Sequence, residues 1–71
     1  MVSDKVYGMY VALMENGEPV SVIPFREWIE IPVNERPDNG HIVIACDELD
    51  AYLQARDGKF IGEALKEQPY D

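Results

Sequence analysis

HIVIACDELDAYLQARDG, residues 41–58, is an apolar run followed directly by the start of a helix. The apolar residues from 42 to 45 fall on both alternating faces of an extended chain, which is typical of a strand covered on two sides. Asp47 follows this run and is placed to act as the helix N-cap, because its carboxylate can accept a backbone N–H from the first turn. We therefore expect a strand over 41–46 and a helix that begins at residue 48.

The helix that follows has a regular apolar spacing and a marked end. Leu49, Tyr52 and Leu53 recur three and four residues apart, as on the buried side of a helix, with Ala51 and Ala55 flanking them. Glycine adopts the left-handed conformation after a C-cap without a steric cost, and Gly58 provides one. The sequence therefore predicts a helix over 48–57.

Near the N-terminus, the run VYGMYVALM over residues 6–14 fits a helix or a strand by periodicity alone. The Asn16-Gly17 pair that follows decides for a strand, because it is a strong signal for a two-residue hairpin turn. We expect strands over 6–14 and 19–23, the second ended by Pro24, which cannot donate a ladder hydrogen bond. The expected register pairs Glu15 with Glu18, Leu13 with Val20 and Val11 with Val22, and makes one core face of Val11, Leu13, Val20 and Val22.

Two further segments are less regular. Residues 24–33 fit two patterns, a helical one around Trp28 and a strand-like one around Ile31. We favour a short helix over 24–30. The polar, turn-rich residues 34–40 connect it to the next strand. Beyond Gly58, the apolar spacing predicts another short helix over 60–67.

Together these elements predict a single α+β domain over residues 1–71. The expected form is a small two-layer sandwich, a three-stranded and mostly antiparallel sheet of order 2-1-3 with two or three short helices on one face. The other face would then be bare and apolar. An uncovered apolar patch usually marks a contact surface, so we expect partner binding or self-association at Tyr10, Ala12, Met14 and Ile23.

Composition limits the possible functions of the chain. It has 71 residues with 14 acidic and six basic side chains, a formal net charge of −8. Such a field repels the phosphates of nucleic acids and of anionic membranes and attracts basic proteins. One cysteine and one histidine make neither an intrachain disulfide nor a four-ligand zinc site. With no apolar run of about 20 residues, we expect a soluble, cytoplasmic protein.

The sequence holds no motif that predicts catalysis. Phosphate loops, dinucleotide-binding glycine patterns, nucleophile elbows and paired cysteines are absent. His41 and Cys46 lie five residues apart on one expected strand, which places their side chains on opposite faces. Asp47, Glu48 and Asp50 suit the start of a helix for reasons of capping and dipole. We therefore expect no catalytic residues, no metal, no cofactor and no enzymatic activity.

Two hypotheses about function remain. The first is a small acidic protein-interaction module, in its sharper form an inhibitor or adaptor that binds a basic, nucleic-acid-binding protein by charge mimicry. The alternative is a homo-oligomeric structural module with a self-complementary sheet face or edge. The carboxylates expected to contact a basic partner are those of Glu15, Glu18, Asp47, Glu48 and Asp50.

Overall fold

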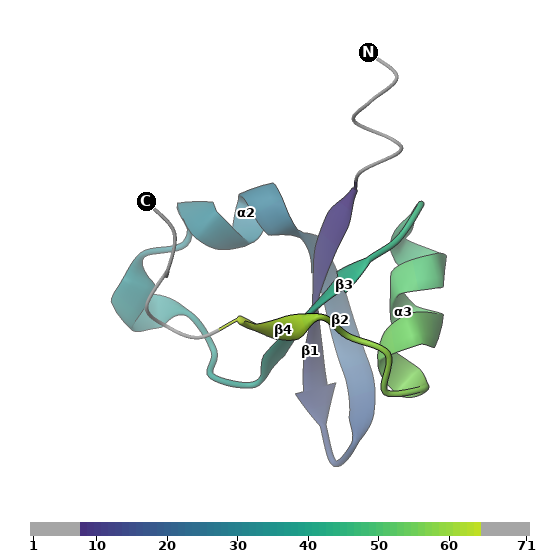
Figure 1. Ribbon diagram of the computed structural model, residues 1–71. Helices are drawn as coiled ribbons and strands as arrows, with labels where there is room; N and C mark the ends of the chain where they lie inside the picture. Colours follow the sequence, from purple (N-terminus) through teal and green to yellow (C-terminus); the bar gives the residue numbers. More distant parts are fainter. Residues whose placement is uncertain (1–7, 65–71) are drawn as a thin grey trace.

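The computed structural model describes residues 8–64 as an α+β fold around one antiparallel sheet (Figure 1). The sheet has four strands in the order β2-β1-β3-β4, where three in the order 2-1-3 were expected. Two α-helices and one 3-10 turn complete the described chain. The elements are β1 (Met9–Glu15), β2 (Glu18–Pro24), α2 (Phe25–Glu30), η1 (Val33–Glu35), β3 (Gly40–Ile44), α3 (Glu48–Arg56) and β4 (Gly62–Ala64).

The hairpin of β1 and β2 turns at Asn16 and Gly17, both of which have positive φ angles, 57° and 84°. Asparagine and glycine tolerate this conformation, which matches the twist of the flanking strands. The pairing of Glu15 with Glu18 is confirmed, but the register shifts between Leu13 and Met14.

A β-bulge at this point changes which residues of β2 face the core. Leu13 pairs with Ser21 rather than with Val20, because one extra residue is inserted into β2. Val20, expected in the core, is 59% exposed. Val22 pairs with Ala12 and packs in the cluster beneath α3, on the other face of the sheet from Val11 and Leu13. The periodicity of the sequence carries no signal for such an insertion, so the expected core face was wrong at both Val20 and Val22.

The fourth strand replaces the start of the helix expected over 60–67. The chain reverses after α3, and the Ile61 N–H donates to the Ile42 carbonyl at 2.8 Å. β4 then pairs antiparallel with β3, from Ile42 opposite Gly62 to Gly40 opposite Ala64. Gly62 would be unfavourable inside a short helix, which explains why this segment pairs with the edge of β3 instead. The rest of the expected helix lies outside the described residues.

The helices cover both faces of the sheet, not one. Alternate residues of β1 point to opposite sides, so Val11 contacts the cluster around Trp28 of α2, whereas Ala12 contacts the cluster beneath α3. Figure 1 shows α2 and α3 on either side of the strands. The expected two-layer arrangement, with all helices on one face, is therefore wrong. α3 packs on the face of the sheet opposite to α2.

On the α2 side the core is built around Trp28, which is fully buried. Arg36 is also buried and reaches back to the end of α2, where its Nε donates to the Ile31 carbonyl and its Nη2 to the Ile29 carbonyl, both at 2.9 Å. Its guanidinium carbon lies 5.9 Å from the centroid of the Trp28 ring. A single arginine thus satisfies carbonyls that the end of a helix leaves without partners.

On the other face, α3 is defined at both ends. The Asp47 carboxylate accepts the Asp50 N–H at 2.8 Å, which confirms the predicted N-cap. At the other end the Gly58 N–H donates to Ala55 and the Lys59 N–H to Gln54, with Gly58 at a φ of 79°. This pair of bonds is a Schellman motif and confirms the role predicted for Gly58.

Candidate protein-binding surface

The outward side of α3 carries its large apolar residues. Leu49 is 67% exposed, Tyr52 37% and Leu53 36%. Their spacing of three and four residues places them on one side of the helix. We call Leu49, Tyr52 and Leu53 the α3 stripe.

The inward side of α3 carries small residues instead. Ala51 and Ala55 are buried against Val43 and Ala12 of the sheet. They lie two positions along from Leu49 and Leu53, which in a helix places them on nearly the opposite side. The sequence analysis expected the stripe on the buried side, and this was wrong.

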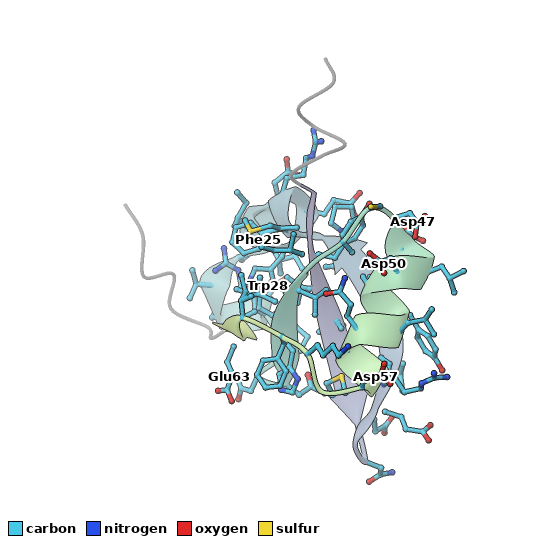
Figure 2. All side chains as sticks on the ribbon, turned by 45° about the vertical axis from the view of Figure 1, so that its right-hand side comes forward. Phe25, Trp28, Asp47, Asp50, Asp57 and Glu63 are labelled. Carbon is cyan, nitrogen blue, oxygen red and sulfur yellow. The ribbon has the colours of Figure 1, made fainter. Side chains whose placement is uncertain are left out.

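Charged residues lie at both ends of the α3 stripe, with acidic ones at the start of the helix and basic ones at its end. Asp47, Glu48 and Asp50 lie at the start of α3, and Figure 2 shows Asp47 and Asp50 at that end with Asp57 at the other. Arg56 lies in the last turn, with its Nε 3.9 Å from the Asp57 carboxylate. Lys59, also exposed, lies three residues beyond the end of the helix. The start of α3 is thus acidic, whereas its end carries two cations and one acid.

The apolar residues expected to bind a partner pack beneath this chain's own helices, Ala12 fully buried and the other three partly buried. Tyr10, Ala12 and Met14 belong to the cluster beneath α3, and Ile23 belongs to the cluster around Trp28. The four residues therefore lie on two different faces of the sheet and do not form one surface.

The acidic residues expected to bind a partner form two separate groups. Glu15 and Glu18 are exposed and face each other across the hairpin turn. Asp47, Glu48 and Asp50 lie at the start of α3, which Figure 1 shows at the opposite end of that helix from the hairpin turn. Two of the three also serve the fold, since Asp47 caps the helix and Asp50 accepts the Cys46 N–H at 3.1 Å.

The surface formed by the described residues is strongly anionic. Among residues 8–64, ten acidic side chains are exposed against three basic ones, those of Arg26, Arg56 and Lys59. The fourth basic residue of this range, Arg36, is buried and bonded to backbone carbonyls. Little positive charge is therefore left at the surface to offset the carboxylates.

In the described part of the chain, the two side chains considered for catalysis have separate surroundings. His41 stacks on Phe60 with ring centroids 4.1 Å apart, whereas Cys46 is exposed just before α3. Within residues 8–64 no group of three His, Cys, Asp or Glu side chains is placed to hold a metal ion. None of the helices in this range is long and apolar enough to cross a membrane.

One open cavity of about 540 Å³ lies where β1 and α2 begin. Of the described residues that line it only Arg26 and Glu27 are charged, and both are exposed. This described lining contains no cysteine, serine or histidine and no group of metal-binding side chains. The lining residues are Gly8, Met9, Tyr10, Pro24, Phe25, Arg26 and Glu27.

Sequence reasoning missed the α3 stripe because the helix is apolar on two sides. A signal was present in residue size, since alanines allow a helix to approach a sheet more closely than leucines do.

Comparison of the chain with protein-family models, with curated proteins and with solved structures gave no match.

Proposed function

We propose that this chain is a small, acidic, non-enzymatic protein-interaction module of the cytoplasm, which binds the basic surface of another protein. The single observation that carries the proposal is the excess of exposed carboxylates over exposed cations among residues 8–64. A field of this sign speeds the encounter with a positively charged partner and disfavours anionic ones.

In its sharper form, the partner is a nucleic-acid-binding protein and the module is its inhibitor or adaptor. The exposed carboxylates would then occupy the basic side chains that otherwise contact phosphates. The hairpin pair Glu15 and Glu18 supports this form, because two like charges face each other across a turn without contributing to stability. A basic partner would relieve that repulsion.

The test is capture of partners from the source cell on the immobilised full-length chain. We expect basic proteins to bind at low salt, to elute at high salt and to be displaced by duplex DNA or by RNA. Binding that is insensitive to salt would contradict the charge-driven proposal. Salt-sensitive binding without displacement by nucleic acid would contradict only the inhibitor form.

A matched pair of charge reversals shows which carboxylates matter. Glu15→Lys with Glu18→Lys changes the hairpin tip, and Glu27→Lys with Glu30→Lys changes α2 by the same net charge. All four residues are exposed. If the hairpin tip contacts the partner, the first pair weakens binding more than the second; equal losses mean that the overall field is sufficient.

The alternative is a homo-oligomeric structural module with a self-complementary sheet face or edge, and of these two the edge is the better supported. Each face of the sheet is covered by a helix of the same chain. Self-association would then use a sheet edge or a surface outside the sheet.

A further inference from the structure

We propose that the α3 stripe is the contact surface of a homodimer, in which α3 packs antiparallel against α3 of a second copy. This goes beyond the proposed function, because it names a different surface and a different partner. It starts from the stripe itself, three large apolar side chains held outward while the small residues of the same helix are buried.

The distribution of charge along α3 indicates which partner fits. Of the four lysines and arginines within residues 8–64, two stand at the end of this one helix, Arg56 and Lys59. A uniformly basic partner would be repelled there. A second copy running antiparallel instead brings this cationic end next to the acidic start of α3, at Asp47 and Glu48.

Two-fold symmetry makes this match occur twice. In an isologous contact each surface patch meets its own copy, so Leu49 of one chain approaches the Leu53 region of the other, and the reverse. The same operation places each Arg56 near the other copy's Glu48. Asp57 lies beside Arg56 and offsets part of its charge, which leaves Lys59 to reinforce the cationic end.

The size of the stripe sets the expected strength. The nine residues of α3 span about 13 Å along the helix axis. A helix pair of this length buries less than the roughly 1,200 Å² at which standard protein interfaces begin. We therefore expect a weak dimer, with a dissociation constant on the order of 10 μM to 1 mM.

The experiment is sedimentation equilibrium of the full chain over a concentration series that spans this range. We expect the average mass to rise from monomer toward dimer. Leu49→Lys should leave the protein monomeric throughout, with an unchanged circular dichroism spectrum because Leu49 is largely exposed. The matched control is Val20→Lys, which also replaces an exposed apolar residue by lysine but lies on β2, outside the α3 stripe. This variant should dimerise like the unmodified chain.

Charge reversal then tests the antiparallel arrangement. Glu48→Lys alone and Arg56→Glu alone should each weaken dimerisation at least about fivefold, since each places like charges together. The two changes in one chain restore opposite charges and should recover most of the affinity. A wild-type chain that stays monomeric at the highest concentration, or equal losses for Leu49→Lys and Val20→Lys, would overturn the dimer. Failure of the double variant to recover would overturn the antiparallel pairing.

Discussion

α2 and α3 cover opposite faces of one sheet, but they bury different kinds of side chain. α2 turns its largest residue, Trp28, inward, where it meets Val11 and Ala64. α3 turns only alanines inward and leaves its large apolar residues outside. The helices also differ at their starts, because α2 has no side-chain cap, whereas α3 is capped by Asp47 (Figure 2).

The difference shows two ways in which a short helix can be held on a sheet. A six-residue helix without a capping side chain depends on burial of large side chains. A helix with small inward residues gains little apolar area, so close approach to the sheet and satisfied ends carry more of its stability. Large apolar side chains are then available outside, for a second contact.

The largest effect is expected where α2 depends on one residue. Trp28→Ala removes a fully buried indole and should lower the free energy of unfolding by about 3–5 kcal/mol. A chain of this size has roughly 4–10 kcal/mol of stability in total, so the variant should be largely unfolded or close to it. Chemical denaturation followed by circular dichroism measures the change.

The control for this prediction is the aromatic residue of the other helix. Tyr52→Ala removes a ring that is 37% exposed and should cost less than about 1 kcal/mol in the monomer. Equal losses for the two variants would break the comparison, since they would mean that the outward side of α3 contributes to the core as much as Trp28 does.

The next effect tests whether α3 requires small residues on its inward side. Ala55→Leu adds three carbons at a contact where Ala55 is 2% exposed, and overpacking should cost about 1–3 kcal/mol. Leu49→Ala, the reverse exchange on the outward side, should change stability by less than about 0.5 kcal/mol. Thermal unfolding of dilute, monomeric samples of both variants measures the difference. A stabilised Ala55→Leu variant would show that α3 can move away from the sheet without loss.

A smaller effect is expected at Gly40, where β3 passes beneath the Trp28 cluster. A Cβ atom at this position would lie 2.8 Å from Val11 Cγ1 and 3.2 Å from the Ala64 Cβ. Gly40→Ala should therefore cost about 1–2 kcal/mol, as one methyl group is forced into a filled space. Gly62→Ala on the neighbouring strand meets no atom within 4 Å and should be neutral. If Gly40→Ala were neutral, the α2 side of the sheet would be loosely packed at this position, in contrast to the close contact expected beneath α3.

The sequence was sufficient for the features that local chemistry determines. The Asn16-Gly17 turn, the Asp47 cap and the Gly58 terminus each depend on the conformational preference or hydrogen bonding of one or two residues. The order 2-1-3 of the first three strands was also predicted correctly, and β4 is added beside β3.

The features that could not be predicted from the sequence depend on contacts between segments that are distant along the chain. The bulge at Val20 and the pairing of β4 with β3 are decided by neighbouring strands, and the burial of Arg36 by the end of α2. The orientation of α3 was ambiguous because alanine and leucine both count as apolar in a periodic pattern. The candidate surface was missed for the same reason, since it lies on the side that periodicity assigned to the core.

The smallest effect sharpens the contrast in how the two helices begin. Asp47→Ala removes the carboxylate that accepts the Asp50 N–H, and should cost about 1 kcal/mol. For a domain of this size that corresponds to a decrease in melting temperature of roughly 4–8 °C. Asp47→Asn should retain most of the stability, because an amide oxygen can accept the same bond. Glu48→Ala removes a neighbouring exposed carboxylate without a capping bond and should cost only a few tenths of a kcal/mol. Equal losses at Asp47 and Glu48 would mean that α3 responds to charge at its start rather than to the cap.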